Sequence, residues 1–185
     1  MKLSCAACLA GLLLLGLFCV LPASAADITG YVGGIKPGSL TLKGVSTALD
    51  SSPVYGFRIG LDFLPFLGHE HTLGFSSGYL VPSSVSAFTN PKGFVYNSNL
   101  ILGAKVGRVV PFVTAGVGLI HQYGAPSLEV GTKFAINYGG GLKIPRLLGP
   151  LGVRFDVRGY TATGLNSGRL NMLEVTGGVL LSFGK

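Results

Sequence analysis

The stretch that decides the fold is VRFDVRGY, positions 153–160. The odd positions from 153 to 157 are apolar, and the even positions hold Arg154, Asp156 and Arg158. Successive side chains of a β-strand point to opposite faces of the sheet, so this pattern predicts a strand with one apolar and one charged face.

The same alternation recurs along the rest of the chain. Phe57, Ile59 and Leu61, for example, alternate with Arg58 and Gly60. The segments that follow this pattern are 27–34, 55–64, 71–80, 95–106, 111–122, 132–144, 151–161 and 171–183. They predict an all-β fold of about eight strands.

The connectors between these segments alternate in length. Segments 35–54, 81–94, 123–131 and 162–170 are long and polar, whereas 65–70, 107–110 and 145–150 are short. Short turns at one end and longer loops at the other are typical of a transmembrane β-barrel, whose short turns face the periplasm. We therefore expect a single antiparallel up-and-down barrel with longer extracellular loops.

The first 25 residues have the features of a secretory signal peptide. Lys2 supplies a positive charge, residues 6–20 are almost wholly apolar, and Pro22 precedes the small residues 23–25. A membrane span needs a longer apolar run, of about 20 residues. All three cysteines lie in this segment. We expect cleavage after Ala25, one barrel domain over 26–185, and no disulfide or thiolate site within it.

The composition indicates which face of the barrel is outside. Only 11% of the residues are charged and 30 are glycine. No apolar run reaches the roughly 18 residues of a transmembrane helix, and only helices and closed barrels satisfy their backbone hydrogen bonds in lipid. A soluble barrel would expose its charged face. The sequence favours the membrane barrel, and a soluble periplasmic ligand-binding barrel is kept as the alternative.

Aromatic residues are expected in two belts where the wall meets the membrane interfaces. The predicted belts are Tyr55, Phe57, Phe94, Tyr96, Tyr123, Phe134 and Tyr160 on the long-loop side, and Phe63, Phe66, Phe112 and Phe183 on the short-turn side.

These strand patterns resemble the OmpA/OmpX-like family of small outer-membrane β-barrels. The resemblance is carried by ITGYVGG at 28–34, VVPFVTAGVG at 109–118 and VRFDVRGY at 153–160. It implies a location in the cell outer membrane and contact with outer-membrane lipids, lipopolysaccharide and the barrel-assembly machinery. Members often end on an aromatic residue that this machinery reads; here Phe183 is followed by Gly184 and Lys185.

Seven charged residues fall on the predicted lumenal face of their strands. They are Arg58, Asp62, Lys105, Arg154, Asp156, Arg158 and Glu174. An arginine or lysine facing lipid at the midplane costs about 2–4 kcal/mol, so inward placement is preferred. Buried charges must pair, because an unpaired one is strongly destabilising. We interpret the set as an ion-pair network that closes the lumen; a small gated pore is the alternative.

Two further sets contain residue types that could form a site, but neither pattern is complete. His69 and His71 share a face, as metal ligands would, but no third ligand is evident at this predicted turn. His121, Ser127 and Glu129 lie near one rim and supply the residue types of a lipid-modifying enzyme, without its spacing or a known motif. We therefore predict neither a metal site nor an enzyme.

The distribution of charges and glycines bears on the possible partners. The net charge is +7, but the basic residues are scattered singly, which argues against nucleic acid. Glycine clusters such as 139–141 lack the following helix of a phosphate-binding loop, and no cofactor is predicted. The sequence predicts a monomer with a structural or interaction role in the cell envelope, with loop 35–54 as the surface for an external partner.

Overall fold

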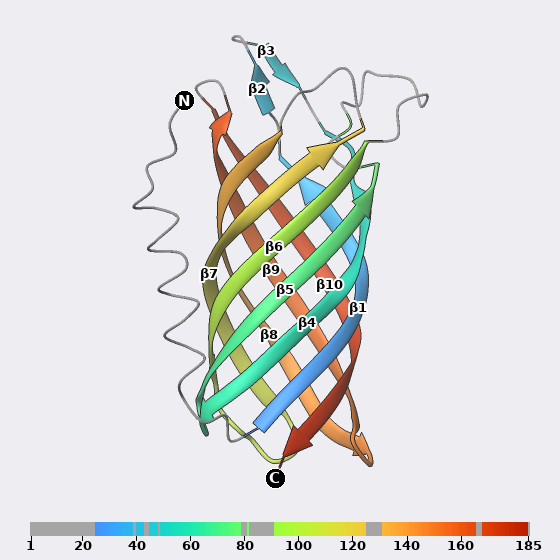
Figure 1. Cartoon of the computed structure of the whole chain (residues 1–185), viewed down its shortest axis with the longest axis vertical. Coiled ribbons are helices and arrows are strands. Elements are labelled where there is room, and N and C mark those ends of the chain that lie inside the picture. The colour runs from blue at the N-terminus through green and yellow to red at the C-terminus, as the bar shows by residue number, and fades with distance from the viewer. Residues whose placement is uncertain are drawn as a thin grey trace.

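A computed structural model describes residues 25–38, 40–42, 45–47, 49–78, 81, 91–124, 131–165 and 168–184. Eight antiparallel strands close into a barrel in the order β1-β10-β9-β8-β7-β6-β5-β4 (Figure 1). These strands are β1 (Ala25–Pro37), β4 (Ser52–Leu64), β5 (Leu67–Ser77), β6 (Lys92–Gly103), β7 (Val110–Tyr123), β8 (Thr132–Leu148), β9 (Leu151–Leu165) and β10 (Gly168–Gly184). Among the described residues, no helix is long and apolar enough to cross a membrane. The predicted fold class is confirmed.

Each strand pairs with both of its neighbours, and the pairing of β1 with β4 and β10 closes the barrel. β1 pairs on one side with β4 and on the other with β10, so Ala25 lies between Asp62 and Gly184. No barrel strand is left with an unpaired edge, which is the condition for spanning a membrane with strands. The short turns 65–66 and 149–150 lie at the end of the barrel where β1 starts and β10 stops (Figure 1).

The connectors differ from the prediction at several places. β9 runs to Leu165 and β10 starts at Gly168, so the expected long loop over 162–170 is wrong. Ala162 and Leu170 continue the inward face, each 1% exposed, and this extends the two strands. β5 begins at Leu67, so 67–70 is strand instead of turn. The first long connector contains a hairpin that the sequence did not reveal, β2 (Leu40–Leu42) paired with β3 (Val45–Thr47).

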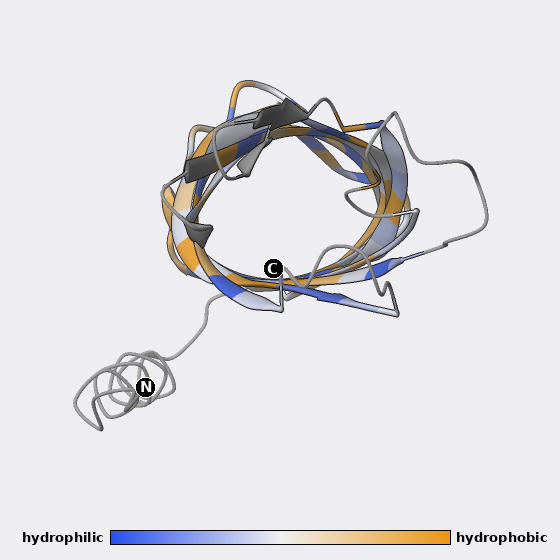
Figure 2. Cartoon of the chain, turned by 90° about the horizontal axis from the view of Figure 1, so that it is seen from above, coloured by the Kyte–Doolittle hydropathy of each residue, from blue (hydrophilic) through white to orange (hydrophobic). Residues whose placement is uncertain are grey.

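The wall of the barrel is apolar outside and polar inside. Val113, Phe155 and Val179 are 57–60% exposed on the outer face, whereas Arg58 and Arg158 are at most 1% exposed on the inner face. Viewed along the barrel axis, hydrophobic and hydrophilic positions alternate along the closed ring of strands (Figure 2). This is the arrangement of a barrel that faces lipid, and it contradicts the soluble alternative, which would bury the apolar face.

Two of the predicted belt residues lie inside the barrel. Tyr160 is 1% exposed and Phe112 is 5% exposed, and both point into the lumen. Tyr160 has the same parity as Arg158 in β9, and Phe112 has the same parity as Thr114 in β7, so the pleat turns them inward.

Candidate functional site in the barrel lumen

A network of charged side chains crosses the middle of the lumen. It joins three arginines to three carboxylates from four strands: Arg58 of β4, Glu70 of β5, Arg154, Asp156 and Arg158 of β9, and Glu174 of β10. Each of these residues is at most 1% exposed. The formal charges cancel within this set, so the lumen holds a neutral layer of buried side chains.

The contacts within the network are short and shared. Nε and Nη2 of Arg154 donate to the two oxygens of Asp156, each at 2.9 Å. Nη2 of Arg158 reaches both Asp156 Oδ1 at 2.9 Å and Glu70 Oε1 at 2.6 Å. Arg154 also donates to Glu70. Two-pronged contacts of this kind suit the planar guanidinium, which holds carboxylates in a fixed geometry.

The Arg58 side chain connects β4 with β9 and β10 across the lumen. Its Nη2 donates to Glu174 Oε1 at 2.9 Å, and its Nη1 donates to Asp156 Oδ2 at 3.3 Å. The guanidinium also lies 3.8 Å from the centre of the Tyr31 ring. Tyr160 donates from its hydroxyl to the second oxygen of Glu174 at 3.1 Å. These contacts tie the charged layer to five adjacent strands of the barrel, β5, β4, β1, β10 and β9.

The structure places the seven predicted lumenal residues in two groups. Arg58, Arg154, Asp156, Arg158 and Glu174 all belong to the network. Asp62 is half-buried nearer the short turns, and Lys105 is exposed because β6 ends at Gly103, two residues before it.

Glu70 was missed because the sequence analysis placed it in a turn. It contacts all three arginines, with Arg58 Nε at 3.9 Å, and is 0% exposed. The signal was present, because Thr72, Gly74 and Ser76 already mark the lumenal face of β5. Continuing that parity by one step reaches Glu70.

A vestibule opens below the network at the short-turn end. It has a volume of about 620 Å³ and is bordered by Asp27, Asp62, Phe112 and Lys143 among others. Lys143 Nζ donates to Asp27 Oδ2 at 2.7 Å across it. Neither residue of this second ion pair is among the seven predicted lumenal charges, and Lys143 falls at the end of the expected strand 132–144.

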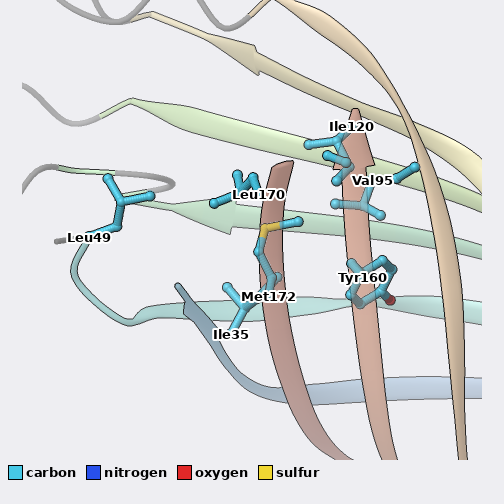
Figure 3. Packing of buried hydrophobic residues seen from close by; sticks show 9 residues of the cluster. Ile35, Leu49, Val95, Ile120, Tyr160, Leu170 and Met172 are labelled. Carbon is cyan, nitrogen blue, oxygen red and sulfur yellow. The ribbon is translucent and has the colours of Figure 1, made fainter. Parts of the chain in front are cut away.

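The lumen above the network changes from polar to apolar. Asn137 donates to Asn97 at 3.2 Å just above the arginines. Glycines make room for this layer, because a Cβ on Gly118 would collide with the Tyr96 carbonyl and with Asn97. The apolar layer follows (Figure 3). Its members are Ile35, Leu49, Val95, Ile120, Ala135, Ala162, Leu170 and Met172, together with Tyr160.

Leu49 closes the apolar layer from the loop side. It belongs to the connector between β3 and β4 and is only 8% exposed. The next residue, Asp50, donates its backbone N–H to Val81 O at 2.9 Å, which joins the first long connector to the second. An apolar layer offers no groups that replace the hydration of an ion, so it adds a second barrier to the charged one.

The sequence candidates for metal and acyl chemistry lie elsewhere. His69 and His71 point away from the lumen, with ring centres 4.6 Å apart. Across the described part of the chain, no three His, Cys, Asp or Glu side chains converge as metal ligands would. His121 contacts Thr132 at 2.9 Å, and Ser127 and Glu129 lie outside the described residues.

Solved structures share this architecture. Neisserial surface protein A matches with a TM-score of 0.66 at 15% identity, over 86% of this chain and 99% of that one. The chain has the OmpA/OmpX-like fold of small outer-membrane barrels. OprG from Pseudomonas aeruginosa matches this outer-membrane barrel with a TM-score of 0.64 at 13% identity, over 89% and 98%. The N-terminal β-barrel domain of OprF from the same organism has a TM-score of 0.55 at 16% identity, over 87% and 98%. No family model and no curated protein matches the sequence.

The fold and the apolar outer wall together place the protein in the cell outer membrane. This agrees with the sequence-based prediction. The short turns then face the periplasm, and the hairpin β2–β3 lies at the extracellular end.

Proposed function

We propose that the protein is a structural and interaction component of the outer membrane whose lumen is closed, and that it carries out no chemistry of its own. The observation that carries this proposal is the neutral network of three arginines and three carboxylates, all at most 1% exposed. It is supported by the apolar layer above the network.

Conduction would require the network to open. Arg58 lies between Asp156 and Glu174, so any path past it breaks contacts at 3.3 and 2.9 Å. Separating one partner of a buried ion pair costs about 3–5 kcal/mol, which makes spontaneous opening rare. A small gated pore is the second candidate, because a charged lumen can in principle rearrange.

The test is the conductance of the refolded protein in a planar bilayer. We expect no discrete openings from the natural sequence. In the double variant Glu70→Ala/Arg158→Ala, two large side chains are lost from the charged layer and the formal charge stays balanced, so brief openings are expected. The matched control Val175→Ala/Val179→Ala shortens two outward-facing side chains and should remain silent. Discrete openings of the natural protein under the same conditions would contradict the proposal of a closed lumen and support the gated pore.

We propose that partners are met outside the lumen. The lipid-facing wall contacts outer-membrane lipids and lipopolysaccharide, the barrel-assembly machinery inserts the chain as a monomer, and residues 1–25 are removed on export. The first connector, of which Gly38, Asp50 and Ser51 are exposed in the described part, offers a surface for an external partner. Deleting residues 39–48 should abolish binding of such a partner to whole cells while the barrel still folds; unchanged binding would assign the contact to another loop.

A further inference from the structure

The half of the outer wall nearer the short turns has one polar cluster. In the half of the wall nearer the short turns, the paired outward positions of the barrel strands are apolar, aromatic or glycine, except for His69, His71 and Ser98. These exceptions are neighbours: His71 is the cross-strand partner of Ser98, and His69 lies two residues before His71 in β5. Three polar residues gathered at one place on a lipid-facing surface are not explained by the closed lumen.

The side chains of this cluster hydrogen-bond to one another. Ser98 Oγ lies 3.1 Å from Nε2 of His69, and Tyr96 OH lies 3.0 Å from Nδ1 of His71. The two imidazole rings meet edge to face at 4.6 Å. Among the described residues, the structure gives no hydrogen bond to Nε2 of His71. When the Tyr96 hydroxyl donates to Nδ1, the proton of the neutral imidazole is on Nε2, which is then a donor.

The surroundings of the cluster are those of a membrane surface. Ile59 pairs with His71 on the other side and is 40% exposed, and Leu100 pairs with His69 and is 46% exposed. Val117, beyond Ser98, is 47% exposed. A polar donor in such a wall is costly unless its partner comes from the lipid, because no water is available in the hydrocarbon.

The depth of the cluster selects the kind of lipid group. His69 and His71 are two and four residues from Leu67, the periplasmic end of β5. A tilted strand climbs about 2.5 Å per residue, so the two rings lie roughly 5 and 10 Å above that end. Phe66, in the turn below, is 58% exposed and marks the membrane interface. The cluster therefore lies in the periplasmic leaflet, at the boundary where glycerol esters meet the acyl chains.

From this placement we propose that His69, His71, Tyr96 and Ser98 form a binding site for one glycerophospholipid of the periplasmic leaflet. His71 Nε2 and the Ser98 hydroxyl donate to the ester carbonyl oxygens of the lipid. Tyr96 and His69 hold these two donors in position, and the acyl chains lie along Ile59, Leu100 and Val117. The site belongs to the outer wall and does not depend on whether the lumen is closed.

The experiment is a lipid titration followed by native mass spectrometry of the folded protein in detergent micelles. The probes are dioleoyl-phosphatidylethanolamine and its diether analogue, which lacks the carbonyl oxygens. We expect one saturable lipid per barrel, and at least tenfold weaker binding of the diether lipid. The comparison of these two lipids with the natural protein tests the ester contact, and it does not depend on the folding of any variant.

The variant His71→Leu/Ser98→Ala makes the cluster apolar. It should bind the diester lipid at least tenfold more weakly and no longer distinguish it from the diether lipid. The control Tyr138→Phe removes a hydroxyl from the outer wall of β8, 57% exposed, and should bind like the natural protein. Folding of each protein is checked by its heat-modifiable gel mobility. Equal affinity of the natural protein for the two lipids would overturn the site, and so would a double variant that binds the diester lipid as tightly as the natural protein does.

Discussion

Replacing Glu70 by glutamine removes one negative charge from the centre of the network and keeps the shape of the side chain. Glu70 contacts Arg158 at 2.6 Å, Arg58 at 3.9 Å, and Arg154. After the change, three arginines share two carboxylates in a layer that is at most 1% exposed. Removing one partner of a buried pair costs about 3–5 kcal/mol, and we expect that loss in the free energy of unfolding.

The matched double variant separates charge from packing. Glu70→Met/Arg158→Met removes one charge of each sign and fills the space with apolar side chains. Buried ion pairs replaced in this way are often neutral in stability, so the double variant should lose less than about 2 kcal/mol. The single changes should add to much more, which gives a coupling energy of several kcal/mol in a double-mutant cycle.

The assay is urea unfolding in phospholipid vesicles. The chain has no tryptophan and 7 tyrosines, so unfolding is followed by tyrosine fluorescence and by the gel shift of the folded barrel. The control Asp62→Asn changes a half-buried carboxylate outside the network and should cost less than about 1 kcal/mol. A loss below about 1 kcal/mol for Glu70→Gln, or a double variant as unstable as the sum of the singles, would refute the reasoning.

Three further changes test other layers of the barrel. Gly118→Ala collides with the backbone of β6 and should cost about 1–3 kcal/mol in urea unfolding, whereas Gly30→Ala has open space and should change little. Arg58→Lys keeps the charge but loses the planar stack on the Tyr31 ring and the forked contacts, and should lower the unfolding free energy by about 2 kcal/mol. Leu49→Ala empties a buried position in the first connector and should speed trypsin cleavage after Lys43 in folded protein; an unchanged cleavage rate would show that Leu49 does not hold the connector.

The strand pattern of the sequence predicted the barrel because its period is two. Once Arg154, Asp156 and Arg158 share a face, the pleat alone places them on one side of the wall. The same rule, applied one step further, would have turned Tyr160 inward. It was instead assigned to a membrane belt because its residue type suits an interface, which shows that parity outweighs residue preference inside a regular strand.

Strand ends were less predictable, because they depend on pairing with a neighbour. β5 starts at Leu67, which pairs with Leu64 of β4, and residues 67–70 taken alone do not indicate that the strand starts there. The consequence was functional: Glu70, the carboxylate that contacts all three arginines, was assigned to a turn. The extension of β9 and β10 over most of 162–170 has the same cause, since each strand continues only as far as the other pairs with it.

The partners within the lumen could not be read from the sequence, because parity fixes the face of a residue but not its height. Arg58 and Glu174 are 116 positions apart and belong to strands separated by β1. Height follows from the stagger of the closed barrel, in which Thr29 pairs with Arg58 on one side and Leu180 on the other. Arg58 is thus in register with Leu180, six residues from Glu174 along β10, and the tilt of the strands together with the length of the arginine side chain brings it to Glu174 and Thr176. A shift of one strand by two residues would preserve every inward and outward position and still separate the charges. The ion pairs thus add a requirement that the alternation does not contain, and they favour one stagger among several that bury the same residues.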